Sequence, residues 1–299
     1  MMAETPAQTE LLNPDFLRRL ERLQLFSRRI FRGQMRGERR SPRKGLSIEF
    51  ADYRDYVRGD DLRFIDWSAY ARLDRLFLKL FLEEQDLCFY VLLDVSQSMD
   101  WGEINKLNYA KKVAAALAYI GLSNLDKVGL AAFSAQATEV FSPARGRHLI
   151  WRMFDFLNGL RPTGQTSLHS FCREFALKYR RRGIVVLISD LLDPAGYEEA
   201  LKFLLHGNND VYLIHVLADE EINPAVRGHL DLVDCETEDH TEITASPQLF
   251  AIYKRTVNAF CTQLKRYAAR YGMNYLLTPT SADFEQLILT VLRARGLVK

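Results

Sequence analysis

The chain has 299 residues, and 48% of them are hydrophobic, so it can bury a substantial core. Its 40 basic and 38 acidic residues nearly balance, which gives no global preference for nucleic acid or for a membrane surface. No apolar run approaches the roughly 20 residues that span a bilayer, and no basic segment followed by an apolar one begins the chain. The four cysteines are widely spaced and argue against disulfides and zinc. We therefore expect a reducing, cytoplasmic location.

The N-terminal part begins with a polar stretch, residues 1–12, which we expect to be a disordered tail. Asn13 and Pro14 are typical of a helix start. Apolar residues then follow at spacings of three and four, which indicates one helical face: Phe16, Leu20, Leu23, Phe26 and Ile30. The opposite face is basic, and it can bind anionic lipid or nucleic acid, or stay in solvent while the apolar face packs. The basic loop that follows has no interleaved aromatic residues, which favours packing or protein docking and makes nucleic acid an unexpected partner.

The stretch 41–84 mixes charges of both signs with aromatic residues and sustains no helical period. Its end, residues 76–83, is predicted to be a strand, and residues 84–86 can turn it back onto 87–94 as an antiparallel hairpin. We interpret the stretch either as an irregular cap on the sheet or as a docking surface. The candidate docking residues are Arg43, Lys44, Tyr53, Arg63, Asp66 and Trp67.

The rest of the chain alternates buried strands with helices. Strands are expected at 87–94, 127–133, 138–141, 183–190, 210–216 and 273–277, and a small hairpin at 230–235 and 240–244. Helices are expected at 104–122, 147–157, 168–179, 197–205, 246–271 and 284–293. Continuous apolar strands between helices predict an α/β fold with a doubly wound, mostly parallel, Rossmann-like sheet. We assign residues 86–299 to this domain and residues 13–85 to an N-terminal extension that is helical and irregular and ends in a strand.

Oxygen-bearing side chains follow the first buried strand at alternate positions. Asp94 ends the strand, and Ser96 and Ser98 come next. In an extended segment every second side chain points the same way, so the three can converge on one point. The alternative is a strand followed by a helix that Ser96 or Ser98 caps.

Two later pieces complete the pattern. Thr166 lies in a loop that opens a helix, and Asp190 ends the second apolar strand. In a doubly wound sheet Asp94 and Asp190 then end neighbouring strands, and two carboxylates that close repel each other unless a proton or cation lies between them. Carboxylate and hydroxyl oxygens suit Mg²⁺ or Mn²⁺. The sequence therefore predicts a metal site made by Asp94, Ser96, Ser98, Thr166 and Asp190.

These motifs also resemble a known family. DVSQS, TGQTS and ISD, in this order, look like the metal-ion-dependent adhesion site of von Willebrand factor type A (vWA) domains. The resemblance implies the same five residues as site residues, although Leu191 follows Asp190 where many such domains have glycine. The upstream stretch SPRKGLSIEFADYRDYVRGDDLRFIDWSAYAR is similar to the bacterial "domain of unknown function 58" family. That resemblance implies association with MoxR-type AAA+ ATPases and no enzymatic activity.

We therefore expect a metal-dependent protein-binding module. Its partner donates a carboxylate to the metal, and a MoxR-type AAA+ ATPase or its client is the expected partner. One alternative is a metal-dependent hydrolase or phosphatase that uses Asp94. The sequence contains no P-loop, HExxH, GxSxG or DxD motif after the first strand, which argues against it. A second alternative is association with anionic lipid or nucleic acid through the basic N-terminal segment.

Overall fold

The computed structural model describes residues 12–22, 49–58, 60–82, 88–135, 138–225, 228–237, 239–291 and 297. The chain divides into two compact units, one of residues 1–27 and 87–299 and the other of residues 28–86. Helix α1 (Pro14–Leu20), which the sequence analysis assigned to the N-terminal extension, thus belongs to the larger unit. The predicted helical positions Leu23, Phe26 and Ile30 lie outside the described residues.

The larger unit is built on a six-stranded sheet with the order β10-β7-β6-β3-β4-β5. Its parallel strands are β3 (Cys88–Asp94), β4 (Lys127–Phe133), β6 (Gly183–Ser189), β7 (Asp210–Leu217) and β10 (Asn274–Pro279). The edge strand β5 (Thr138–Ala144) is antiparallel to β4. Long apolar runs make strands that are buried on both faces, and the predicted doubly wound, mostly parallel α/β fold is confirmed.

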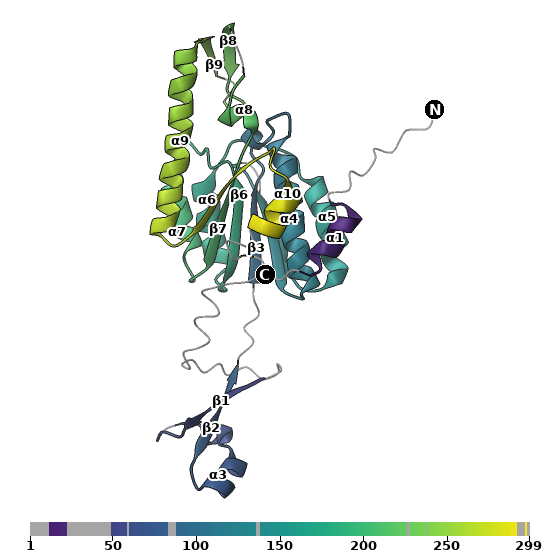
Figure 1. The fold of residues 1–299 in the computed structure, drawn as a ribbon, viewed down its shortest axis with the longest axis vertical. Coiled ribbons are helices and arrows are strands. Elements are labelled where there is room, and N and C mark those ends of the chain that lie inside the picture. Colours follow the sequence, from purple (N-terminus) through teal and green to yellow (C-terminus); the bar gives the residue numbers. More distant parts are fainter. Residues whose placement is uncertain are drawn as a thin grey trace, which may run out of the picture. The chain divides into compact units, whose positions relative to one another are not determined.

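Helices cover both faces of this sheet (Figure 1). One face packs against α1, α4 (Lys106–Ser123), α5 (Ile150–Gly159) and α10 (Phe284–Gln286). The other packs against α6 (Leu168–Lys178), α7 (Glu198–Leu204) and α9 (Pro247–Arg270). Strand β3 serves both cores, because its alternate side chains point to opposite faces.

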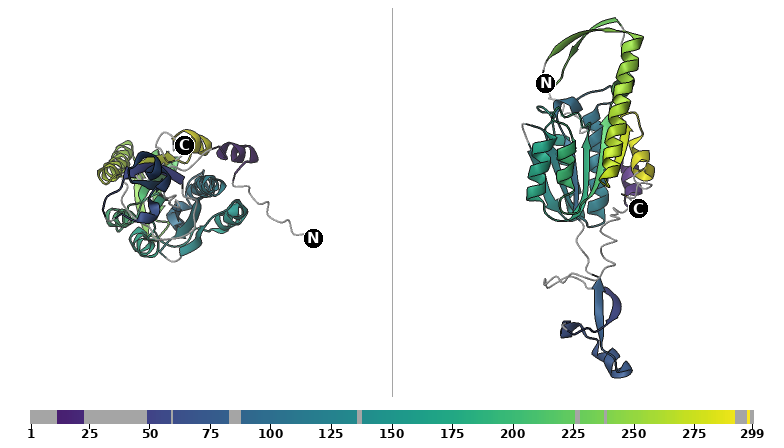
Figure 2. Two further views of the ribbon diagram at one scale, coloured as in Figure 1. Left: turned by 90° about the horizontal axis from the view of Figure 1, so that it is seen from below. Right: turned by 90° about the vertical axis from the view of Figure 1, so that its left-hand side faces the viewer.

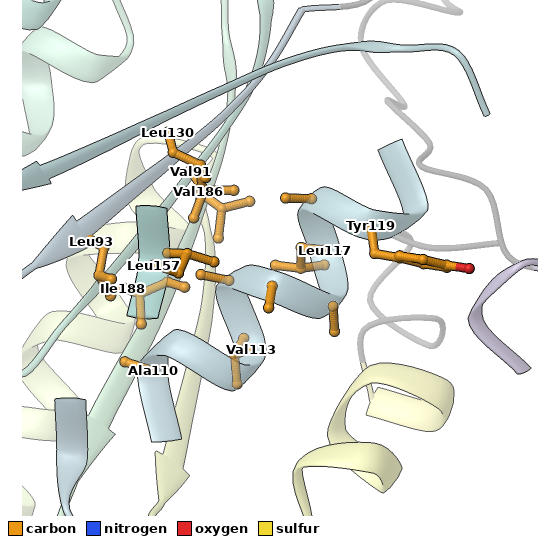
Figure 3. Close-up of a cluster of buried hydrophobic side chains, with 14 of the residues drawn as sticks. Val91, Leu93, Ala110, Val113, Leu117, Tyr119, Leu130, Leu157, Val186 and Ile188 are labelled. Atoms are coloured by element: carbon orange, nitrogen blue, oxygen red, sulfur yellow. The ribbon is translucent and has the colours of Figure 1, made fainter. Parts of the chain in front are cut away.

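The core against α4 shows this alternation (Figure 3). Val91 and Leu93 of β3 lie beside Val186 and Ile188 of β6, and all four are at most 1% exposed. The intervening residue Leu92 belongs to the opposite core. Because β3 and β6 carry complete apolar faces, the polar residues beyond their ends are held on a rigid base.

Helix α1 begins as its sequence predicts. The Asn13 side chain accepts a hydrogen bond from the backbone N of Asp15 at 3.0 Å, and Pro14 takes the first helical position. Phe16 and Leu20 are fully buried, and the Phe16 ring meets the Phe284 ring edge-on at 5.2 Å. The apolar face of α1 therefore packs on the protein. Leu12, predicted to lie in the tail, is also buried.

The smaller unit contains β1 (Glu49–Asp55), the 3-10 turn η1 (Leu62–Phe64), α3 (Trp67–Leu73) and β2 (Phe77–Leu82). Strands β1 and β2 pair in antiparallel fashion. The predicted hairpin between the strand at 76–83 and the strand at 87–94 is wrong, because β3 has β4 and β6 as its two parallel neighbours. The prediction of an irregular stretch also missed the short helix α3.

After β7 the chain forms the short helix α8 (Asp219–Ile222), which was not predicted, and then the predicted hairpin of β8 (Gly228–Val233) and β9 (His240–Ala245). Figure 1 shows this hairpin beside one end of α9, and Figure 2 (right) shows it arching beyond the end of the sheet. The chain then passes through α9, β10 and α10 to a π turn at Leu287–Val291. None of the helices in the described part of the chain combines the length and apolar character that a membrane crossing requires.

Candidate metal site

Two carboxylates lie at the carboxyl ends of adjacent parallel strands. Strand β3 ends at Asp94, and Asp190 directly follows β6. Leu93 pairs with Ile188 in the register of the two strands, so both chains leave the sheet at the same level. Both aspartates are fully buried. The sheet therefore brings together the two carboxylates that the sequence pattern paired, at the edge where sites form in such folds.

The loop after β3 turns its hydroxyls toward Asp94. The Ser96 hydroxyl donates to Asp94 Oδ1 at 2.7 Å, and the Ser96 backbone N donates to the same oxygen at 3.0 Å. The Ser98 hydroxyl lies 3.0 Å from that of Ser96. Ser96 does precede a 3-10 turn at Gln97–Met99, but it makes no side-chain cap hydrogen bond there. The Ser96 hydroxyl thus belongs to the carboxylate cluster and does not cap the turn, contrary to the capped-helix alternative.

The loop that carries Thr166 is tied to the loop after β3 through its backbone. The Gln97 N donates to Gly164 O at 2.8 Å, and the Thr163 N donates to Val95 O at 2.8 Å. Thr166 itself is 6% exposed and lies just before α6. Backbone pairing of this kind fixes the position of Thr166 relative to Ser96 and Ser98.

The cluster favours a proton or a cation between its carboxylates. Burial, followed by the neighbouring Asp190 carboxylate, raises the pKa of Asp94 to about 7. Asp94 is held by donors on both oxygens, because the Ser189 hydroxyl donates to its Oδ2 at 2.6 Å. The sequence analysis missed Ser189. Its position could have indicated it, because Ser189 is the last residue of β6, the strand that pairs with β3.

A lysine in the core is the largest feature that the sequence analysis missed. Lys106, at the start of α4, is fully buried and donates to Asp190 Oδ2 at 2.8 Å and to Glu221 Oε1 at 2.6 Å. Burial lowers the pKa of the Lys106 ammonium, but the Asp190 and Glu221 carboxylates more than offset this and raise it. No local pattern marks these contacts, which join residues 84 and 115 positions apart.

The donor set fits a hard divalent cation. The Asp94 carboxylate lies near that of Asp190, and the Lys106 ammonium pairs with Asp190 and Glu221, so negative charge remains in excess when Asp94 is ionised. Hydroxyl oxygens from Ser96, Ser98 and Thr166 are the neutral ligands that Mg²⁺ or Mn²⁺ accepts. Among the described residues no group of three or more His, Cys, Asp or Glu side chains is arranged to hold a metal, so the predicted site depends on hydroxyl oxygens as well as on carboxylates. The metal role of the five residues stays a prediction.

The loop after Asp190 has an unusual backbone. Leu191 adopts φ +57°, the left-handed region that favours glycine, and its backbone N donates to the Ser189 hydroxyl at 2.9 Å. The Leu191 side chain is only 2% exposed. The chain therefore keeps the loop shape that glycine permits and adds a buried apolar anchor in its place.

The predicted docking residues of the smaller unit have different surroundings. Asp66 is 5% exposed, caps α3 by accepting from the backbone N of Ser68 and Ala69, and accepts from the Tyr53 hydroxyl at 2.8 Å. These donors, Tyr53 first, hold the pKa of Asp66 at about 2. Asp66 thus has a structural role in its own unit. Trp67 is 59% exposed.

The remaining docking candidates are solvent-facing or lie outside the description. Arg63 is exposed and pairs with its near neighbour Asp61 at 2.7 Å. Arg43 and Lys44 fall outside the described residues. Docking through this unit stays a prediction.

Comparison with known proteins places the chain in a family. The family described as "Protein of unknown function DUF58" matches residues 52–260. Uncharacterized proteins of Mycobacterium tuberculosis and Mycobacterium bovis are each 26% identical over 283 residues, which cover 91% of this chain and 87% of the relative. The strands β3 and β6 lie within the matched region, which begins at residue 52, inside β1 of the smaller unit.

Solved structures similar to this chain include BatB, a conserved hypothetical protein of Bacteroides thetaiotaomicron, at 16% identity and a TM-score of 0.42; the match covers 68% of this chain and 95% of BatB. The SpRpn10 VWA domain is 12% identical, with a TM-score of 0.41, over 68% of this chain and 94% of that domain. The family match spans more than half of the sequence, and the chain belongs to the DUF58 family.

Proposed function

We propose that this chain is a protein-interaction module that binds Mg²⁺ or Mn²⁺ through Asp94, Ser96, Ser98, Thr166 and Asp190. The observation that carries the proposal is the buried Asp94–Asp190 pair, with serine hydroxyls turned onto Asp94. Burying two carboxylates together is unfavourable unless a proton or a cation compensates them. Lys106 already compensates Asp190. A divalent ion is the economical partner for Asp94 and the hydroxyls.

The residues around the ion have distinct tasks in this proposal. Ser189 and Ser96 hold the Asp94 carboxylate in one orientation, and Lys106 does the same for Asp190. The bound ion supplies a coordination position for an acidic side chain of a partner protein. Helix α6 begins two residues after Thr166, and its N-terminus favours an anion at that place.

We favour binding over hydrolysis because of the state of Asp94. Both of its oxygens accept hydrogen bonds, and the side chain is fully buried. A nucleophilic carboxylate needs direct access to its substrate. The proposed partner is a MoxR-type AAA+ ATPase or its client, as the family resemblance implies.

The test measures binding of a MoxR-type ATPase from the same organism to the full chain, in Mg²⁺ and in EDTA. EDTA is expected to weaken binding at least about tenfold, which corresponds to roughly 1.4 kcal/mol. Ser98→Ala and Thr166→Val should weaken it similarly. Ser170→Ala, an exposed hydroxyl near the same loop, is the matched control. Binding that is equally tight in EDTA and in both site variants would refute metal-dependent recognition.

A further inference from the structure

A carboxylate of the chain itself lies on the predicted ligand Thr166. Glu236 Oε1 accepts a hydrogen bond from the Thr166 hydroxyl at 2.9 Å, and Glu236 Oε2 accepts one from the Thr166 backbone N at 3.2 Å. The Glu236 backbone O also accepts from Gln165 Nε2 at 3.4 Å. Both oxygens of one carboxylate are thus engaged by a single residue 70 positions away. A two-point contact of this kind fixes the carboxylate in place and orientation.

The turn that carries Glu236 is shaped to present it. Glu236 lies between β8 and β9, and Asp234 closes the turn by accepting from the backbone N of Glu236 at 2.8 Å and of Thr237 at 2.9 Å. The Asp234 backbone N also donates to Asp239 O at 2.9 Å. The turn is therefore ordered by its own hydrogen bonds, independently of the contact with Thr166.

The hairpin itself presents little buried apolar surface. Leu232 and Val233 of β8 are 48% and 53% exposed, and the described side chains of β9 are exposed or half-buried. Elements with few buried apolar contacts open at low cost in free energy. Withdrawal of Glu236 from Thr166 therefore requires displacement of a solvent-exposed hairpin and leaves the core intact.

We infer that Glu236 is the resident carboxylate of the metal site, and that an acidic partner binds by displacing it. The inference rests on the proposed function. A carboxylate on the Thr166 hydroxyl, next to the N-terminus of α6, has the chemistry and the place that the partner's acidic side chain needs. The β8–β9 hairpin then acts as a built-in competitor, and the apparent affinity for the partner is the intrinsic affinity multiplied by the fraction of chains with the hairpin displaced.

The test uses the full chain with Mn²⁺ as the probe. Paramagnetic enhancement of water-proton relaxation reports how many water molecules exchange on the bound ion. In Glu236→Gln a water molecule takes the carboxylate's position on the ion. The relaxivity per bound Mn²⁺ should therefore rise by the amount that one exchanging water ligand contributes. Mn²⁺ should also bind about tenfold more weakly, as is typical when a group that supports a metal site is removed. Glu242→Gln removes the same charge from an exposed position of the same hairpin and should behave as the wild type.

Acetate then tests displacement. Added to the Mn²⁺-loaded protein, it should lower the relaxivity of Glu236→Gln at concentrations that leave the wild type unchanged. Glu236→Asp, whose shorter side chain withdraws the carboxylate from Thr166, provides a second variant if Glu236→Gln folds poorly, and it should show the same rise. Equal relaxivity in the wild type and both Glu236 variants, with Mn²⁺ bound in all, would overturn the inference and leave the proposed function standing. A wild-type chain that binds no Mn²⁺ would overturn both.

Discussion

The Lys106 ammonium lies 2.8 Å from Asp190 Oδ2, and neither side chain is exposed to solvent. Lys106 also contacts Glu221 at 2.6 Å, so one cation of the chain links α4, the end of β6 and α8. This arrangement compensates Asp190, whereas Asp94 accepts hydrogen bonds from the Ser96 and Ser189 hydroxyls. Asp190, one of the proposed metal ligands, is therefore also part of a buried ion pair within the chain.

Lys106→Met tests whether Asp190 and Glu221 need this cation. The substitution keeps most of the side-chain volume but leaves Asp190 and Glu221 buried without their cation. We expect the free energy of unfolding to fall by about 3 kcal/mol or more in EDTA. Because a ligand of the folded state stabilises it by mass action, saturating Mg²⁺ should raise the unfolding midpoint of Lys106→Met more than that of the wild type.

Thermal unfolding by circular dichroism, with and without Mg²⁺, provides the measurement for Lys106→Met. Lys265→Met, on the exposed side of α9, is the control and should unfold like the wild type. An unfolding midpoint of Lys106→Met equal to that of the wild type in EDTA would show that the buried ion pair is not needed.

The left-handed backbone at Leu191 predicts that glycine there gives a more stable protein than alanine, the reverse of the usual order. Leu191→Ala and Leu191→Gly both remove the buried side chain, but only glycine adopts φ +57° without steric cost. The left-handed conformation costs other residues about 1–2 kcal/mol, which exceeds the usual entropic advantage of alanine. Leu191→Gly should therefore be the more stable of the two, by about 1 kcal/mol or less, in urea denaturation. A more stable Leu191→Ala would mean that the loop relaxes away from this conformation.

His215 predicts a pH dependence of stability. Burial, which outweighs the nearby Asp190 carboxylate, lowers the pKa of this histidine to about 4. Between pH 4 and its ordinary value of 6.5 the unfolded chain binds a proton that the folded chain does not, so stability rises with pH across this window. His215 contributes roughly 3 kcal/mol to the rise in the free energy of unfolding across this window.

His215→Gln should therefore flatten the profile between pH 4 and 6.5, measured as the urea midpoint at each pH. The same substitution at His206, an exposed residue after α7, is the control. A slope that is identical in His215→Gln and in the wild type would assign the pH dependence to other groups.

Local patterns in the sequence were sufficient to predict the strands β3 and β6 and to bring Asp94 and Asp190 together. The apolar runs before Asp94 and Asp190 predicted β3 and β6, and the order of strands then placed both carboxylates at one edge. Alternation along an extended segment predicted that Ser96 and Ser98 converge with Asp94. Their hydroxyls do lie 3.0 Å apart, but a 3-10 turn at Gln97–Met99 brings them together, and not the extended segment that the prediction assumed.

Long-range pairing was not predictable in the same way. Lys106 and Glu236 meet their partners across 84 and 70 residues, and neither lies in a local motif. The hairpin wrongly predicted between 76–83 and 87–94 has the same origin: a strand, a polar turn and a second strand suggest antiparallel pairing. In the structure β3 instead takes two parallel partners from distant parts of the chain. Side-chain periodicity identifies a strand but carries no information about its neighbour.

Direct measurement of Mn²⁺ binding to the full chain tests the central claim. Electron paramagnetic resonance counts the free ion during titration, and we expect one bound Mn²⁺ per chain that Mg²⁺ displaces. Asp94→Asn and Thr166→Val should each weaken binding at least about tenfold, whereas Ser170→Ala should bind as the wild type does. Absence of binding to the wild-type chain, or equal binding by the wild type and both site variants, would contradict the assignment of Asp94 and Thr166 to a metal site.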